Sequence, residues 1–216
     1  MTYVMSDIHG EHDRFKAMLQ EIQFSDKDTL YILGDMIDYG PDSIAVVQDV
    51  MSRKNIQAIM GNHEQMCVSF FSRGVDCQWA GHEGTPTKEA FLALSEKERS
   101  RILQYLESLP NHLDIRVGWR RFHLVHGWPS WDHYTRIWGR PEMNSKSPFL
   151  FRRVIVGHTP VFVLNKKNLL CVASGMGHFF IEKTNGFIDI DCGCGYPFAQ
   201  GRLACLRLDD MKEFYV

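Results

Sequence analysis

The sequence contains no long hydrophobic run, no large excess of either charge and no cysteine-rich pattern. None of its apolar stretches approaches the ~20 residues that a membrane-spanning helix needs. Lys and Arg together number 24 and Asp and Glu 26, giving a formal net charge of −2, which argues against a strongly basic nucleic-acid-binding protein. Six cysteines in 216 residues do not indicate a disulfide framework. We therefore expect no membrane partner and no nucleic-acid partner.

We expect no secretory leader, because residues 1–7 turn acidic without a positively charged start. The cytoplasm, a reducing compartment, is the expected location. Hydrophobic residues make up 44% and charged residues 23% of the chain, values typical of a globular protein. The length predicts a single domain over residues 1–216 with a sizeable core. Histidine is the unusual component, with ten copies.

Hydrophobic periodicity predicts the order of the elements. The first part of the chain alternates helical spacing with short apolar runs at 3–5, 29–33 and 56–60, and this β-α-β-α-β order predicts a parallel sheet. Residues 64–110 are predicted to form a mostly helical cap insertion. The second half predicts a loop at 127–150, an Asn-Gly hairpin turn at 185–186, and strands at 113–117, 122–125, 153–156 and 203–208. The two halves therefore predict two sheets within one domain.

Each strand of the first part ends in a polar loop next to a glycine, and two later strands end in histidine. Carboxyl ends of parallel strands meet at one edge of a sheet, where the ligand sites of open α/β sheets form. The first three loops are spaced by roughly 30 residues, the length of a βαβ unit. We therefore expect one cluster of polar side chains made of Asp7, His9, Asp35, Asn62, His126 and His158.

Carboxylate and imidazole groups together form a metal-ligand set. They suit borderline divalent ions such as Mn, Fe, Co or Zn. The number of ligands exceeds what one ion needs, so the set predicts a two-metal site with a carboxylate shared between the ions. Asp35 is the expected bridge because it is central among the loops and follows a glycine.

The ordered series D-x-H-G, G-D-x-x-D, G-N-H-E, H-G and G-H-T resembles the calcineurin-type metallophosphoesterases. Within them it most resembles the small bacterial and phage Ser/Thr phosphatases of the phosphoprotein phosphatase family. This resemblance implies an α/β fold, a four-layer α/β/β/α sandwich of two mixed sheets, and a binuclear centre with manganese as the first expectation. The first ion would be held by Asp7, His9 and Asp35, and the second by Asp35, Asn62, His126 and His158.

The same resemblance implies roles for the remaining residues. His63 would be the general acid and Asp38 the carboxylate that orients it, and Asn62 would also contact the substrate phosphate. Tyr39 stands where family members have a phosphate-binding arginine, and tyrosine offers a hydrogen bond but no charge. Arg140, in the loop after the H-G motif, matches the family's second phosphate-binding arginine.

These roles predict hydrolysis of phosphomonoesters by a hydroxide that bridges the two metal ions. Phosphoserine or phosphothreonine in proteins is the first expected substrate. A dinucleoside polyphosphate or another small phosphoanhydride is the alternative, because related metallophosphoesterases share this core. A non-catalytic phosphate-binding module is a second alternative, although binding alone does not need a general acid such as His63. The sequence leaves the substrate, the native metals and the oligomeric state open.

Other histidines and basic residues receive structural interpretations. His123 lies three positions from His126 on a predicted strand, so the two side chains point to opposite faces, and we expect His123 to be structural. The basic doublets at 120–121, 152–153 and 166–167 are interpreted as separate solvated strand or turn faces. His82 and His178 lack a partner pattern and are expected at the surface or in packing contacts.

Overall fold

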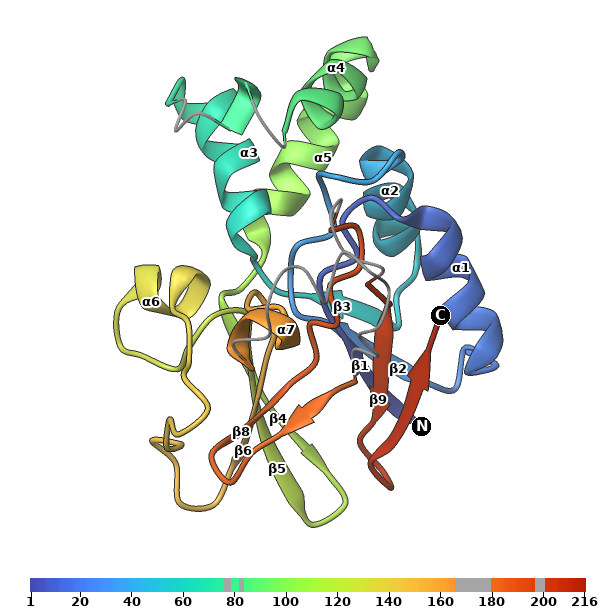
Figure 1. Ribbon diagram of the computed structural model, residues 1–216. Helices are drawn as coiled ribbons and strands as arrows, with labels where there is room; N and C mark the ends of the chain where they lie inside the picture. The colour runs from blue at the N-terminus through green and yellow to red at the C-terminus, as the bar shows by residue number, and fades with distance from the viewer. Residues whose placement is uncertain (76–78, 82–83, 166–179, 197–200) are drawn as a thin grey trace.

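The structure is a computed structural model that describes residues 1–75, 79–81, 84–165, 180–196 and 201–216. Its strands form two five-stranded mixed sheets (Figure 1). The first sheet has the order β10-β9-β1-β2-β3. In it, β1, β2 and β3 run parallel, whereas β9 is antiparallel to both β1 and β10. The bounds are β1 (Thr2–Met5), β2 (Thr29–Ile32), β3 (Ile56–Ala58), β9 (Ala204–Arg207) and β10 (Lys212–Tyr215).

The second sheet has the order β4-β5-β6-β8-β7. Its three central strands, β5, β6 and β8, run parallel, and the edge strands β4 and β7 are antiparallel to their neighbours. Each sheet therefore has a parallel centre whose carboxyl ends can share one site. The bounds are β4 (His112–Val117), β5 (Arg120–Val125), β6 (Arg153–Val156), β7 (Glu182–Lys183) and β8 (Phe187–Asp189).

The helices fall into three groups in Figure 1. The connections between the first three strands contain α1 (His12–Glu21) and α2 (Ser43–Ser52), which cover the outer face of the first sheet. A helical segment above the sheet consists of α3 (Asn62–Arg73), the 3-10 turn η1 (Trp79–Gly81), α4 (Thr85–Ala93) and α5 (Glu96–Ser108). Beside the second sheet lie the short helices α6 (His133–Trp138) and α7 (Val161–Leu164). Among the described residues, no helix is long and apolar enough to span a membrane.

Alternate residues of the central strands face different layers. Val4 of β1 and Ile155 of β6 pack between the two sheets, whereas Met5 packs with the helices on the outer face of the first sheet. Val156 belongs to a third cluster, on the outer face of the second sheet. This period of two is what a strand buried on both faces requires. The predicted α/β fold with two mixed sheets is confirmed.

Two elements differ from the sequence prediction. Helix α6 lies inside the predicted loop at 127–150, because six residues are too few for a helical period to be visible. It begins at an N-cap, where the Asp132 side chain accepts the Thr135 backbone N–H at 2.7 Å. Strand β10 was also not predicted, since among its four residues only Phe214 is buried.

Candidate metal centre

Three loops of the first sheet are joined to one another by close backbone contacts. His9 N donates to Asp35 O at 2.9 Å, and Gly10 N donates to Met36 O at 2.9 Å. A Cβ at Gly61 would lie 2.2 Å from Asp35 Oδ1, so glycine alone lets the third loop approach Asp35 this closely. Because β1, β2 and β3 run parallel, their carboxyl ends bring these loops to one edge of the sheet.

The backbone of these loops is strained. A non-glycine residue in the left-handed region costs of order 1–3 kcal/mol, and such residues concentrate at functional sites. Among the described residues, eight non-glycine residues have a positive φ, and most of them belong to the candidate site. Those in the site are Asp7, His9, Asp35, Asp38, Tyr39 and His158.

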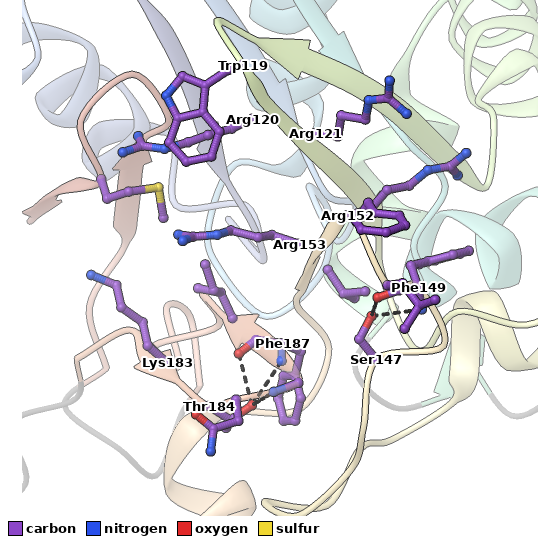
Figure 2. A pocket seen from close by; sticks show the side chains of 17 residues that line it. Trp119, Arg120, Arg121, Ser147, Phe149, Arg152, Arg153, Lys183, Thr184 and Phe187 are labelled. Atoms are coloured by element: carbon purple, nitrogen blue, oxygen red, sulfur yellow. Dashed lines mark hydrogen bonds between the residues drawn. The ribbon is translucent and has the colours of Figure 1, made fainter.

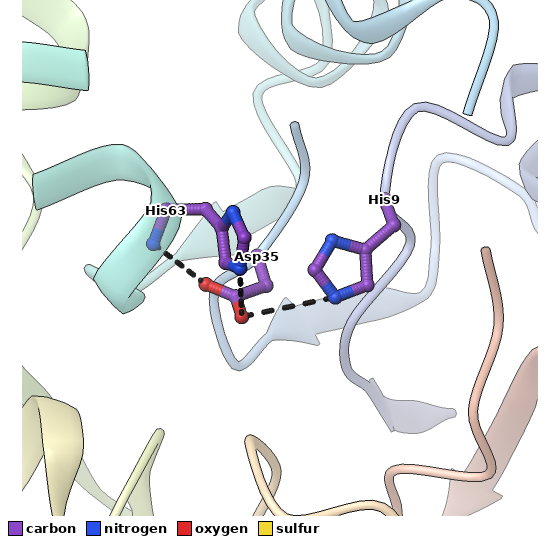
Figure 3. Close-up of side chains that lie close together, drawn as sticks. All are labelled: His9, Asp35 and His63. Atoms are coloured by element: carbon purple, nitrogen blue, oxygen red, sulfur yellow. Dashed lines mark hydrogen bonds and ion pairs between the residues drawn. The ribbon is translucent and has the colours of Figure 1, made fainter. Parts of the chain in front are cut away.

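Asp35 is the centre of the cluster (Figure 3). Its Oδ2 lies 3.3 Å from His126 Nε2, 3.8 Å from His9 Nε2 and 3.9 Å from His63 Nε2. Two groups of potential metal ligands share this carboxylate. His9, Asp35 and His63 form the first ligand group, and Asp35, His126 and His158 form the second. A carboxylate shared by two ligand groups has the placement of a bridging ligand.

The histidines of the cluster fit a divalent cation. His158 Nε2 is buried and has no hydrogen-bond partner in the part of the chain that the structure describes. Burial lowers the pKa of His158 to about 2 and that of His9 to about 4. Both imidazoles are therefore neutral at pH 7, the form that binds metals. A metal ion would supply the partner that the neutral Nε2 atom of His158 lacks.

The buried carboxylates also fit a cation. Burial opposes the charge of Asp35, but the imidazoles of His126 and His63 outweigh it and hold the pKa of Asp35 well below its usual range. The pKa of Asp7 is raised well above its usual range by burial and by the charges of Asp191 and Asp35. A divalent cation would offset this repulsion between carboxylates.

Asp7 and Asn62, the other two predicted ligands, lie next to the second ligand group. Asp7 accepts the His158 backbone N–H at 3.2 Å and the Ser6 hydroxyl, and it belongs to neither ligand group. The Asn62 Oδ1 atom lies 2.9 Å from His126 Nε2. The assignment of Asp7 to the first ion therefore stays a prediction.

His63 forms a hydrogen-bonded chain with Asp38 and Trp79. His63 Nδ1 lies 2.7 Å from Asp38 Oδ2, and the same oxygen accepts the Trp79 indole N–H at 2.6 Å. Burial opposes a charge on His63, but the carboxylates of Asp35 and Asp38 outweigh it and raise the pKa of His63 to about 9. The imidazole therefore carries a proton at neutral pH, as a general acid must.

Three residues of the site received no role from the sequence. Trp79 comes from η1, and no motif marks it. Glu64 is fully buried and accepts three backbone N–H groups from the Asp35 and Gly61 loops at 2.7–3.0 Å. Its place three residues into the start of α3 is that of a capping-box acid, which is a signal the sequence does contain. Asp191 is a further buried carboxylate near the cluster.

Two of the three predicted phosphate contacts, Arg140 and Tyr39, lie at the rim of the cluster. Arg140 is exposed and donates to His158 O at 3.0 Å, which places a cation beside the second ligand group. The Tyr39 ring centroid is 4.8 Å from that of His9 and 5.4 Å from that of His63. An aromatic ring therefore stands beside the first ligand group.

The other histidines lie apart from the cluster or beyond the described residues. His123 Nδ1 is 2.8 Å from Asp114 Oδ1, in a contact between β5 and β4. This contact agrees with the structural interpretation of His123. His82 and His178 lie outside the described residues.

Comparison with known families shows which family this chain resembles. Residues 2–202 match the family model described as calcineurin-like phosphoesterase. The chain belongs to the calcineurin-like phosphoesterase family. The family that the motifs indicated is therefore confirmed.

Curated relatives match part of this phosphoesterase. The symmetrical bis(5'-nucleosyl)-tetraphosphatase of Buchnera aphidicola subsp. Acyrthosiphon pisum (strain Tuc7) is 45% identical over 65 residues, which are 29% of this chain and 24% of that protein. The protein of the same name from Salmonella paratyphi B is 35% identical over 91 residues, 41% of this chain and 32% of that protein. The matches thus span about a quarter to a third of these relatives' length.

Solved structures share the fold of this phosphoesterase over the whole chain. The crystal structure of a putative diadenosine tetraphosphatase superposes with a TM-score of 0.62 at 18% identity, covering 100% of this chain and 92% of that one. A protein serine/threonine phosphatase from Saccharomyces cerevisiae gives 0.58 at 15% identity, covering 100% and 78%. At these identities the likeness establishes the fold alone.

Proposed function

We propose that this phosphoesterase hydrolyses dinucleoside polyphosphates, breaking a phosphoanhydride bond in a substrate that has a nucleoside at each end. The observation that carries the proposal is an aromatic pair beside each of the two ligand groups. The relatives named as symmetrical bis(5'-nucleosyl)-tetraphosphatases support the same substrate class. Protein dephosphorylation, the first expectation from the motifs, receives less support because Tyr39 replaces a phosphate-binding arginine.

Tyr39 and Tyr196 form the aromatic pair beside the first ligand group. Their ring centroids are 6.4 Å apart with an interplanar angle of 48°, and the half-buried Tyr39 ring is in edge contact with His9. An aromatic face next to the cluster can stack on a nucleobase. An arginine at this place would instead favour the extra charge of a phosphate monoester.

Tyr134 and Trp138 of α6 form the aromatic pair beside the second ligand group. Their rings are stacked, with centroids 6.1 Å apart and an angle of 14°. The Trp138 ring lies 6.2 Å from that of His158, and its indole N–H donates to Gln65 at 2.6 Å. Tyr134 is 69% exposed. This fixed indole with an exposed partner ring provides a place where a second nucleobase can stack.

Different side chains of the site would bind the metal ions, bind the phosphate and transfer the proton. Divalent ions held by His9, Asp35, His126 and His158, with His63 left free as the proton donor, would activate water and withdraw electron density from the phosphoryl group. Arg140 would hold a phosphate oxygen through a charge-assisted hydrogen bond. His63 would give a proton to the leaving oxygen as the P–O bond breaks, while Asp38 keeps the imidazole oriented.

We also infer that residues 64–110 act as a cap on this site within one domain. The cap continues α3 directly from Asn62 and His63, which lie in the first turn of that helix. It returns to the site through Trp79, which donates to Asp38. Changes in the cap therefore reach the proton donor through two contacts.

Product analysis tests the proposed function. With Mn²⁺ and diadenosine tetraphosphate, the protein should release ADP from symmetric cleavage, with a higher kcat/KM than for a phosphoserine peptide. Trp138→Leu should raise KM for the dinucleotide. It should leave KM for p-nitrophenyl phosphate, which has no nucleobase, little changed. Trp131→Leu is the matched control, because Trp131 is 99% exposed. A higher kcat/KM for the phosphopeptide would overturn the proposal.

A further inference from the structure

A cavity lies at the end of the second sheet where β5 and β6 begin; Figure 2 shows the side chains that line it. Its volume is about 930 Å³. Arg120 and Arg153, which line the cavity, begin β5 and β6, whereas His126 and His158 follow the carboxyl ends of the same strands. At ~3.3 Å per strand residue, roughly 17 Å separate Arg153 from His158. The cavity is therefore distinct from the metal centre.

Parallel pairing of β5 with β6 brings together two arginine doublets that the sequence keeps apart. The register aligns Phe122 with Arg153, so the doublets at 120–121 and 152–153 line the same hollow. Lys183 of β7 adds a fifth cation. In Figure 2, Arg153 lies in the middle of this lining, between Arg120 and Lys183. The sheet thus turns two apparently separate basic faces into one site.

Carboxylates balance only part of this charge. Asp114 pairs with Arg152 at 2.8 Å, and Glu213 pairs with Lys183. Neither acid lines the cavity, whose described lining contains no Asp or Glu. The positive side of both ion pairs therefore faces the hollow.

The other three arginines keep free hydrogen-bond donors. Arg121 and Arg153 form no ion pair within the described ranges. Arg120 donates one guanidinium N–H to Asp209 O at 2.9 Å, but its Nε is buried and has no hydrogen-bond partner among the residues that the structure describes.

Aromatic rings accompany the cations. The Arg120 guanidinium lies over the Trp119 ring, 5.3 Å from its centroid, and Arg152 lies over Phe149 at 5.1 Å. These cation–π contacts hold the guanidinium groups at the cavity wall. Trp119 itself is 79% exposed, so its ring is available to a ligand.

We propose that this cavity is a second ligand site, which binds a nucleoside polyphosphate through its arginines and stacks the base on Trp119. The guanidinium fork matches the oxygens of phosphate groups, and an exposed aromatic ring stacks on a base. The volume lies in the range of about 300–1,000 Å³ that small-molecule sites have. The cations surround a hollow instead of following a track, which favours a small molecule over a nucleic-acid strand.

Calorimetric titration of the metal-loaded protein with β,γ-methylene-ATP tests this site. The wild-type protein should show two classes of site, one at the metal centre and one at the cavity. Arg121→Gln combined with Arg153→Gln should weaken the cavity class ~10-fold or more while leaving kcat/KM at the metal centre unchanged. Lys97→Gln with Arg101→Gln is the matched control, because it removes the same charge from exposed positions on α5.

Trp119→Leu separates recognition of the base from recognition of the phosphates. It should weaken binding of β,γ-methylene-ATP at the cavity and leave inorganic tripolyphosphate unaffected. A double arginine variant that binds the probe as the α5 control does would overturn the proposal, whether the wild-type protein shows one class of site or two. If Trp119→Leu weakens binding of both probes equally, the cavity recognises phosphate groups and not a nucleoside. Binding of a poly-glutamate peptide without any nucleotide binding would assign the surface to a protein partner instead.

Discussion

Replacing Trp79 by phenylalanine should destabilise the fold, because Trp79 connects the cap to the site. Its side chain is 1% exposed, and its indole N–H donates to Asp38 Oδ2 at 2.6 Å. Phenylalanine preserves an aromatic ring against Phe70 and Phe71 but has no N–H to donate. The fully buried Asp38 carboxylate would then lose a donor that it cannot replace with bulk water.

Two contributions set the size of this effect. A hydrogen bond to a charged group stabilises by about 1.5–3 kcal/mol. The smaller ring leaves a void of roughly 40 Å³, which costs about 1 kcal/mol at ~24 cal/mol per Å³. Together they amount to about 2.5–4 kcal/mol, a large part of the ~5–15 kcal/mol by which natural domains are stable. For a chain of this length the expected fall in Tm is roughly 5–16 °C.

Urea denaturation followed by circular dichroism measures the free energy of unfolding. Trp119→Phe is the matched control, because Trp119 is 79% exposed and its replacement should change the free energy of unfolding by less than about 0.5 kcal/mol. If Trp79→Phe is as stable as Trp119→Phe, the contact between Trp79 and Asp38 does not support the site and the reasoning is refuted.

Three further substitutions test the site. Asp35→Ala should remove both metal ions, because both ligand groups share its carboxylate; elemental analysis checks this, and retention of two ions would contradict the bridging role. His63→Asn should keep both ions and lose ~10²–10⁴ in kcat for an alkyl phosphate, with a smaller loss for diadenosine tetraphosphate, whose leaving group needs less protonation. An equal loss for both would make His63 a ligand instead of an acid. Tyr39→Arg should raise kcat/KM for p-nitrophenyl phosphate and lower it for the dinucleotide in steady-state kinetics, and the opposite shifts would show that Tyr39 does not select the substrate.

The positions of the polar loops could be predicted because a parallel sheet converts spacing in the sequence into position in space. Strand–helix–strand units of similar length place Asp35 next to His9 and His63, and the second sheet brings His126 within 3.3 Å of Asp35. The alternation of apolar residues along β1 and β6 similarly fixes which side chains enter the space between the sheets. These features repeat along the chain, so the sequence alone reveals them.

Contacts between distant segments without a repeating pattern could not be predicted. Trp79 reaches Asp38 across 41 positions of the sequence, and nothing in its neighbourhood marks it as part of a site. The arginine-lined cavity depends on the register of β5 against β6, which aligns Phe122 with Arg153. Helix α6, which carries Trp138, depends on a single cap at Asp132. Each of these features follows from tertiary packing and not from local sequence.

Competition between two substrates in one reaction tests the proposed function most directly. The protein is given diadenosine tetraphosphate and a phosphothreonine peptide at equal concentrations with Mn²⁺. Mass spectrometry follows both products, and their relative rates of formation give the ratio of the two kcat/KM values. We expect ADP to accumulate while the peptide keeps its phosphate. Release of phosphate from the peptide ahead of dinucleotide cleavage would contradict the assignment of this phosphoesterase to dinucleoside polyphosphates.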